Sequence, residues 1–416
     1  MTDAVRTQYE TYPYPAREPK DEAKRLITGS PSHLDELNHY VFGGRLDFSR
    51  PFRALVAGGG TGDGTIMLAQ QLKDAGIPAE MVYLDLSDAS RAIAQARAEA
   101  RGLDFIRFQR GSLLALSELG CFDYIDCCGV LHHLEDPAAG LRSLAGALKP
   151  GGGIGIMVYG EYGRAGVYPL QEALRTLTAG AGPREQVALA RRLLAQLPPT
   201  NGLRRNPFLS DHAESDAGLY DLLLHSQDRA YTVPQLAELA DAGGLAITAL
   251  IEPARYEPAT YLNDPRLLKR LEGLAWLERA ALAERLAGNL TKHIAYLTRP
   301  GDAGTAVAQA QGPAVAPVLK DLDGKAVARG LPPGGSLKVT FSGLSWSLPL
   351  PRLAGPMLAR IDGAATLGDI HAALAQADKG LSWNAFKNQF DQLYNALNGV
   401  NKLLLRHPRT PDTRAE

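Results

Sequence analysis

Apolar runs and helix-period patterns alternate through the first half of the chain. Residues 54–57 form an apolar run of the length expected for a buried parallel strand, and a helical pattern begins at Ile66. Similar strand patterns recur at 81–87, 105–111, 122–130, 155–159 and 245–251, with helical patterns at 90–101 and 141–148 among them. This alternation predicts an α/β fold built on a doubly wound, mostly parallel sheet.

A glycine-rich turn follows the first of these runs. Gly58, Gly60 and Gly62 occupy alternate positions between the predicted strand and helix. Glycine lets a backbone approach a ligand without a Cβ in the way, and a helix N-terminus offers unpaired N–H donors to a carboxylate or phosphate. The spacing is G-x-G-x-G, which differs from the G-x-G-x-x-G of dinucleotide-binding folds. Taken alone, the turn is also compatible with an ordinary tight turn that binds nothing.

Two further motifs follow the turn in order. Residues 122–137 open with Phe-Asp and continue through Val-Leu-His-His-Leu to Asp-Pro, and residues 148–152 read Leu-Lys-Pro-Gly-Gly. Together with the turn, they resemble the motifs of class I S-adenosylmethionine (SAM)-dependent methyltransferases over about residues 50–160. The resemblance implies SAM as cofactor and a Rossmann-like sheet of seven strands, whose antiparallel seventh strand fits 293–299. One departure is Val56, where the family usually has an acidic residue that would be a partner for the ligand's amino group.

Candidate cofactor-binding residues lie at the ends of the predicted strands. Asp85 ends the second strand, where open α/β sheets place ligand-binding groups, and its carboxylate can accept both ribose hydroxyls. A helix-capping role is the alternative, but Ser87 and Asp88 already supply caps. Ser112 stands where the family often has an acidic residue that contacts the adenine amino group. The candidate set is Gly58, Gly60, Thr61, Gly62, Asp85, Leu86, Ser112, Leu113, Gly129 and Val130.

Five residues are candidates for catalysis. His132 and His133 are candidate general bases because imidazole titrates near neutral pH, although they could instead cap and pack the strand end. Tyr14 belongs to a Tyr-Pro-Tyr-Pro arm that is either an aromatic anchor or a lid. His225 and Arg229 close a helical segment after the fifth strand and either form a turn or contact the substrate. We predict that the N-terminal arm and this helical segment meet over the cofactor. Together they would form an aromatic, partly cationic wall that favours a planar or anionic acceptor. Its members would be Tyr12, Tyr14, Tyr159, Arg164, His225 and Arg229.

The chain divides into several predicted units. They are an N-terminal cap at 1–50, a methyltransferase-like domain at 51–299 with a helical insertion at about 161–231, a linker at 300–316 and an accessory domain at 317–410. The linker is rich in Ala, Gly and Pro. The accessory part combines a predicted hairpin with helices and loosely resembles small winged-helix modules. We predict that it serves dimerisation or partner binding, and structural support is the alternative.

Composition narrows the function classes. The 44 Lys and Arg residues balance 45 Asp and Glu residues, so the net charge of −1 gives no support for broad binding of nucleic acid. We expect no membrane span because no run of about 18 apolar residues occurs, and the N-terminus lacks an apolar signal core. Three cysteines, two of them adjacent, favour a reducing cytoplasm. We predict no metal site.

The sequence therefore predicts a SAM-dependent methyltransferase that acts on a small molecule or a protein side chain. A homodimer formed through the C-terminal domain is a further prediction. The alternative is a non-catalytic SAM-binding regulatory or scaffold protein, which the missing acidic residues at Val56 and near Ser112 keep open. A dehydrogenase fits less well, because the glycine spacing differs.

Overall fold

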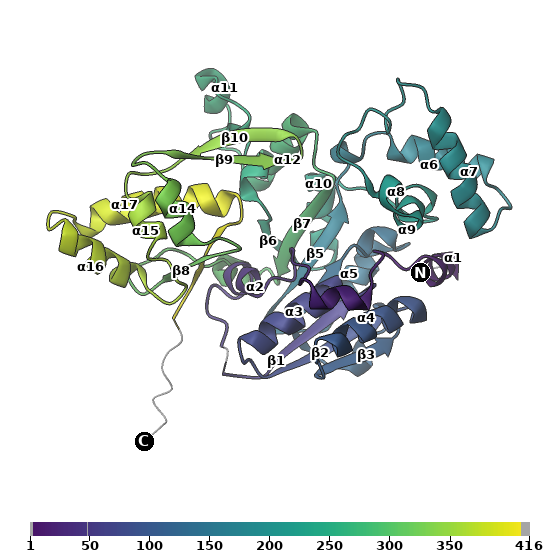
Figure 1. The fold of residues 1–416 in the computed structure, drawn as a ribbon, viewed down its shortest axis with the longest axis horizontal. Helices are drawn as coiled ribbons and strands as arrows, with labels where there is room; N and C mark the ends of the chain where they lie inside the picture. The colour runs from purple at the N-terminus through teal and green to yellow at the C-terminus, as the bar shows by residue number, and fades with distance from the viewer. Residues whose placement is uncertain (1–2, 48, 409–416) are drawn as a thin grey trace.

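A seven-stranded sheet with the order β3-β2-β1-β4-β5-β7-β6 forms the centre of the molecule (Figure 1). It is seen in a computed structural model that describes residues 3–47 and 49–408. The strands are Phe52–Ala57 (β1), Ala79–Asp85 (β2), Ile106–Arg110 (β3), Phe122–Cys128 (β4), Leu148–Tyr159 (β5), Ala246–Leu250 (β6) and Lys292–Thr298 (β7). Strands β1 to β5 pair in parallel, and β7 lies antiparallel between β5 and β6. The predicted fold class and its antiparallel strand are confirmed.

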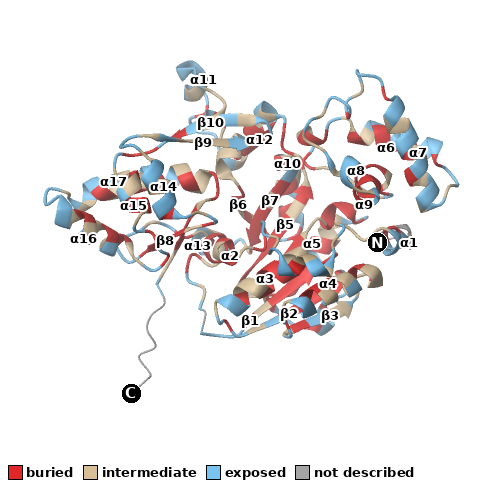
Figure 2. Ribbon diagram, viewed as in Figure 1, coloured by how far each residue is buried: buried red, intermediate tan, exposed pale blue. Residues whose placement is uncertain are grey.

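Helices cover both faces of this sheet, and alternate strand residues point into two different cores. Leu55 and its neighbours on one face pack against α5 (Pro137–Gly146), α10 (Val233–Ala242) and α12 (Trp276–Ala287). Val56 and its neighbours on the other face pack against α2 (Leu34–Tyr40), α3 (Asp63–Asp74) and α4 (Asp88–Ala100). Figure 2 shows the buried residues following the strands between these layers.

The segment between β5 and α10 is mainly helical. Its helices are α6 (Val167–Leu177), α7 (Pro183–Gln196), α8 (Asp211–Glu214) and α9 (Asp216–Leu219), followed by a π-helical turn at Tyr220–Leu224. They share a separate apolar core that includes Leu170, Leu174 and Leu223. In Figure 1 these helices lie on one side of the molecule and the C-terminal elements lie on the other.

The C-terminal part has its own core and two small antiparallel sheets. Its elements are β8 (Ala316–Leu319), α14 (Gly324–Gly330), β9 (Ser336–Phe341), β10 (Leu344–Pro349), α15 (Ala354–Leu358), α16 (Leu367–Ala377), α17 (Trp383–Gly399) and β11 (Leu403–Arg406). Strand β9 pairs with β10 as the predicted hairpin, and β8 pairs with β11. Val318 and Leu404 belong to the same apolar core as α2 and the main sheet, and β11 contacts α2, so this part packs on the sheet domain through that helix.

The stretch 300–316 is packed rather than extended. It contains α13 (Ala303–Ala306), and Ala306 and Ala308 are buried. The Gly43 N–H donates to the Ala306 carbonyl, and the Ala308 N–H donates to the His39 carbonyl. The small side chains that suggested a linker therefore pack in part on the N-terminal cap. The division into domains stays a prediction.

Two details complete the frame. Strand β5 begins at Leu148, earlier than the strand predicted at 155–159, so the Lys-Pro-Gly-Gly segment lies within it. This segment is next to a register irregularity between Phe122 and Tyr124 of β4. Short helices α1 (Asp3–Thr11) and α11 (Pro265–Lys269) flank the sheet domain. Among the described residues, no helix combines the length and the apolar character needed to cross a membrane.

Candidate functional site

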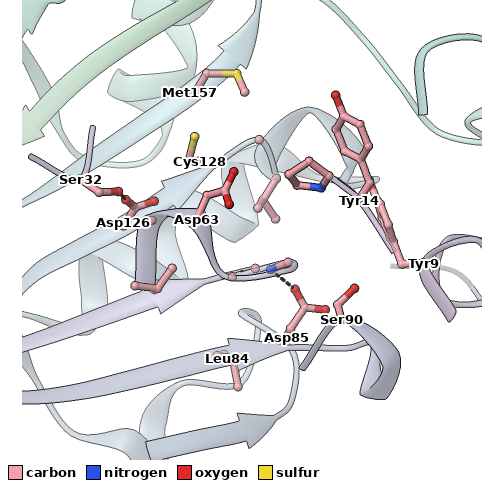
Figure 3. A pocket seen from close by; sticks show the side chains of 18 of the residues that line it. Tyr9, Tyr14, Ser32, Asp63, Leu84, Asp85, Ser90, Asp126, Cys128 and Met157 are labelled. Atoms are coloured by element: carbon pink, nitrogen blue, oxygen red, sulfur yellow. Dashed lines mark hydrogen bonds between the residues drawn. The ribbon is translucent and has the colours of Figure 1, made fainter. Parts of the chain in front are cut away.

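A cavity of about 430 Å³ lies at the carboxyl ends of β1, β2, β4 and β5 (Figure 3). The sheet contributes the glycine turn after β1 and single residues from the neighbouring strands and their ends. The N-terminal part of the chain contributes α1, the tyrosine-proline arm and the loop 27–32. Lining side chains from these elements include Tyr9, Tyr14, Asp85, Ser112, Cys128 and Met157.

The glycine turn is built to let another backbone and a ligand come close. Gly58 and Gly60 have φ of 75° and 51°, in the left-handed region that favours glycine. A Cβ at Gly58 would lie 2.4 Å from a methyl carbon of Val130. The Gly58 and Gly59 N–H groups donate to the Leu84 carbonyl at 2.7 and 3.1 Å, which fixes the turn over β2.

Asp85 is held by backbone donors at the edge of the cavity. Its carboxylate accepts the Gly60 N–H at 2.8 Å and the Ser87 N–H at 2.8 Å. Burial raises the pKa of this carboxyl above its ordinary value, and the backbone donors oppose that rise. An oriented, buried carboxylate suits a ligand hydroxyl, because hydroxyl donors satisfy it without a second charge.

Eight of the ten predicted cofactor residues line the cavity. They are Gly58, Gly60, Asp85, Leu86, Ser112, Leu113, Gly129 and Val130. Thr61 and Gly62 do not line it. The Thr61 hydroxyl donates to the Pro15 carbonyl at 2.7 Å, so it holds the N-terminal arm in place. Gly62 is the N-cap of α3, and a Cβ there would lie 2.9 Å from the Ala94 Cβ, so helix packing requires this glycine.

Of the five catalytic candidates, Tyr14 and His133 line the cavity. His132 is buried behind the lining, with its ring centroid 3.9 Å from that of Tyr159, and neither of its ring nitrogens has a hydrogen-bond partner among the described residues. Arg229 is exposed, and its guanidinium lies over the Tyr231 ring, 4.5 Å from the centroid. Both are outside the cavity because the strand end and the closing turn direct them elsewhere.

His133 and His225 share one stretch of backbone. Nδ1 of His133 lies 2.9 Å from the Gln227 carbonyl, which only accepts, so this nitrogen carries the hydrogen and Nε2 keeps the lone pair. Nδ1 of His225 accepts the Gln227 N–H at 3.0 Å, so the hydrogen of the neutral ring is on Nε2. The two rings stack with centroids 3.8 Å apart. Burial, together with the neighbouring His133, lowers the pKa of His225 well below its ordinary value.

The histidines also belong to two groups with metal-like spacing, His132–His133–Asp228 and His133–Asp221–His225, whose ligand atoms lie within 4.8 Å. In the first group, neither ring nitrogen of His132 nor Oδ1 of Asp228 has a hydrogen-bond partner among the described residues, whereas the second group is hydrogen-bonded. Asp221 accepts the Tyr9 hydroxyl at 3.0 Å and the Tyr159 hydroxyl at 2.8 Å, and Asp228 pairs with Arg164 at 3.2 Å. The second group therefore forms a hydrogen-bonded network, and the expectation of no metal site stays a prediction.

The two arginines predicted for the wall do not line the cavity. Arg164 is buried, 2% exposed at its side chain, but it faces Asp228 and the Tyr159 ring, 3.7 Å from the centroid, and does not line the cavity. Its charge is therefore neutralised inside the insertion. Tyr12 stacks on Tyr220 with centroids 5.4 Å apart and also lies outside the lining. The aromatic part of the wall remains, and other cationic residues, Arg6, Arg17 and Lys292, line the cavity. The preference for an anionic acceptor stays a prediction.

Sequence reasoning missed several lining residues. Tyr9, Asp126, Asp221 and Lys292 all line the cavity. Asp126 interrupts the apolar strand β4, and Asp221 interrupts an apolar helical run of leucines. A carboxylate inside such a run is a usable signal, because it is buried only where it has a role. Lys292 carried no such signal, since a lysine at the start of a predicted strand is common.

Comparison with known proteins gives the family. A family model for a methyltransferase domain matches residues 55–154. An uncharacterized protein of Synechococcus sp. is 34% identical over 306 residues, which cover 72% of each chain. The chain therefore carries a methyltransferase domain, on the seven-stranded sheet of a class I methyltransferase fold.

Other similar proteins are more distant from this methyltransferase. A ubiquinone biosynthesis O-methyltransferase of Albidiferax ferrireducens is 27% identical over 165 residues, covering 37% of this chain and 66% of that one. The solved structure of PKMT2 from Rickettsia typhi has a TM-score of 0.60 at 13% identity and covers 92% of this chain and 76% of that one. At that identity the likeness concerns the fold alone, and it extends through the C-terminal part.

SAM is the cofactor of this methyltransferase, and the residues present fit it. The turn at Gly58 leaves room where a Cβ would collide, and Asp85 offers an oriented carboxylate beside it. Ser112 and Leu113 line the same end of the cavity after β3. The specific contacts of these residues with the cofactor remain predictions.

Proposed function

We propose that this methyltransferase transfers the methyl group of SAM to a protic acceptor group, a hydroxyl or an amine, with His133 as general base. The observation that carries the proposal is the orientation of His133, which lines the cavity with Nδ1 anchored on the Gln227 carbonyl and Nε2 free to accept a proton. SAM, when bound, supplies an electrophilic methyl group. The chain must then align the acceptor and remove its proton.

The tyrosines around His133 shape the acceptor side. Tyr9, Tyr14 and Tyr159 line the cavity, and Asp221 fixes two of them by accepting one phenol hydrogen on each carboxylate oxygen. Their ring faces suit a flat or slender acceptor. One named relative is an O-methyltransferase, which supports a hydroxyl acceptor, and the identity of that acceptor stays open.

The test is transfer of labelled methyl groups from SAM into the small-molecule and protein fractions of a cell extract. The wild type should label one fraction. His133→Gln should lower the rate by about 100-fold or more, the scale of lost general-base catalysis, while its affinity for S-adenosylhomocysteine (SAH) stays within about twofold. His132→Gln is the matched control, because its ring does not line the cavity, and it should keep most of the activity.

Each result has a defined meaning. A His133→Gln variant with full activity would remove the general base from the proposal. Label in the protein fraction would identify a side chain as the acceptor, and label in the other fraction would identify a small molecule. Tight SAH binding without transfer into either fraction would favour a non-catalytic binding protein.

A further inference from the structure

Four carboxylates line the cavity, and of these Asp63 is paired with cations, whereas Asp126 has neutral hydrogen-bond donors alone. Asp63 pairs with Arg17 and Arg97, each at 2.7 Å, while Asp85 and Asp221 are satisfied by backbone and phenol donors. Asp126 is 1% exposed and accepts the Ser32 hydroxyl and the Cys128 N–H. Among residues 3–47 and 49–408, no cation lies within ion-pair distance of Asp126. A buried charge of this kind is costly until a cation joins it.

The strand register places Asp126 directly beside Val56. In the parallel pair of β1 and β4, Asp126 is the direct partner of Val56. Paired residues point to the same face, and neighbouring strands lie about 4.8 Å apart. Class I methyltransferases usually have an acidic residue at the position that Val56 occupies in this chain. Asp126 therefore brings a carboxylate to the same face one strand away, and both residues line the cavity.

The direction of the cofactor follows from the order of the strands. Asp85 and Ser112 follow β2 and β3, so these strands form the predicted nucleoside end of the cavity. A ligand that starts there and crosses the glycine turn after β1 next reaches β4, where Figure 3 shows Asp126 beside Ser32. The amino-acid end of SAM, which carries an ammonium and a carboxylate, would lie at this side.

We propose that Asp126 binds the α-ammonium group of SAM and so replaces the acidic residue missing at Val56. The ammonium supplies both the missing positive charge and N–H donors, and the Ser32 hydroxyl orients the carboxylate that receives them. This inference rests on SAM as cofactor and is independent of the acceptor. Loss of His133 would leave it intact.

The ionisation of Asp126 agrees with this role. Burial raises the pKa of its carboxyl to about 6, and the Ser32 hydroxyl opposes the rise, so most of it is charged at pH 7.5. The titratable side chains of Cys127, Cys128, Tyr124 and Asp63, which lie near Asp126, keep their protonation state between pH 5 and 8. Burial raises the pKa of Cys128 to about 12 and holds that of Tyr124 and Cys127 well above the ordinary range. For Asp63, burial raises the pKa, but the arginines outweigh it and leave the value low.

Calorimetric binding of two ligands tests the proposal. SAH carries the amino group, and its deamino analogue has hydrogen in that place. The wild type should bind SAH about tenfold or more tighter than the analogue, the scale of a charged hydrogen bond. Asp126→Asn should bind the two within about threefold. Asp123→Asn is the control. Asp123 lies on the same strand but outside the cavity lining, and it pairs with Lys149 at 2.7 Å, so this variant should keep the wild-type preference.

Thermal melting of Asp126→Asn and ligand binding by two further variants complete the test. The ligand-free Asp126→Asn protein should melt no lower than the wild type, because it loses an uncompensated buried charge. Should it fail to fold, Ser32→Ala replaces it and should reduce the preference for SAH severalfold. The double variant Val56→Asp/Asp126→Val should restore the preference by moving the carboxylate to β1. An Asp126→Asn protein that still prefers SAH tenfold, or a wild type without preference, would overturn the proposal.

Discussion

Replacing Lys320 by methionine should destabilise the folded chain and weaken cofactor binding. Lys320 follows β8 in the C-terminal part and places Nζ 2.7 Å from a carboxylate oxygen of Glu36 in the N-terminal cap. The same carboxylate accepts the Ser30 hydroxyl at 2.7 Å, and Ser30 lines the cavity. The ion pair thus connects the C-terminal part to the loop that covers the cofactor.

The expected loss of stability depends on the hydrogen bonds that Glu36 keeps in the Lys320→Met variant. Glu36 is fully buried and the Lys320 side chain is 9% exposed, and removing one partner of such a pair costs about 3–5 kcal/mol. Glu36 retains the hydroxyls of Ser30 and Tyr296 and the amide of Asn401, at 2.7 to 2.8 Å. Because these three donors still stabilise the carboxylate, we expect a loss near the lower end, about 3 kcal/mol.

The same pair predicts a dependence on pH. Burial alone would raise the pKa of Glu36, but Lys320 and Ser30 outweigh burial and leave that pKa below its ordinary value. Since the folded-state pKa is the lower one, the stabilisation is present above the unfolded-state pKa and is lost as the pH falls through the folded-state pKa. Lys320→Met should therefore flatten the acid side of the stability profile.

Urea unfolding followed by circular dichroism at pH 7.5 measures the stability change, and SAH titration measures the effect on binding. Lys402→Met is the matched control, because Lys402 pairs with the half-exposed Asp321 at 3.4 Å and should cost about 1 kcal/mol or less. Glu36→Gln/Lys320→Met should be more stable than Lys320→Met alone. A Lys320→Met protein within about 0.5 kcal/mol of the wild type would refute the reasoning about the buried pair.

Four other positions give shorter predictions. Asp85→Ala should weaken SAH binding by about 1.5–3 kcal/mol in calorimetry, and an unchanged affinity would remove Asp85 from the site. Gly58→Ala should lose more stability than Gly180→Ala in urea unfolding, because both have φ near 75–79° but only the first meets a side chain, at 2.4 Å. From pH 7.5 to 5.5, SAH affinity should fall further in the wild type than in Asp126→Asn, because protonation of the carboxyl, pKa about 6, removes its charge; parallel curves would contradict this. Arg229→Ala should keep methyl transfer within about twofold, since its side chain is exposed.

Local sequence signals were sufficient for the frame of the molecule. The alternation of strand and helix patterns predicts the sheet, and the glycine turn and Asp85 predict one end of the cavity, because each feature depends on neighbours close in sequence. Thr61 and Gly62 show the limit of a motif. Both belong to the turn, yet one holds the N-terminal arm and the other permits helix packing.

The rest of the site depends on contacts that no local pattern contains. The proposed role of Asp126 depends on the pairing of β4 with β1, which brings together residues 70 positions apart in the sequence. Asp221 reaches Tyr9 across 212 positions because the insertion folds back over the N-terminal helix. Arg164 and Arg229 were expected at the cavity for their residue type, but neighbouring Asp228 and Tyr231 direct them away from it.

The proposed contacts make cofactor binding and docking of the C-terminal part thermodynamically linked. The loop 27–32 carries Ser32, which orients Asp126, and Ser30, which bonds to the Glu36 paired with Lys320. If Lys320→Met weakens SAH binding by some factor, linkage requires that bound SAH strengthens the Lys320 interaction by the same factor. The cost of Lys320→Met in urea unfolding should therefore be larger with saturating SAH than without it. An equal cost in both conditions would show that the loop keeps its position without the C-terminal contact.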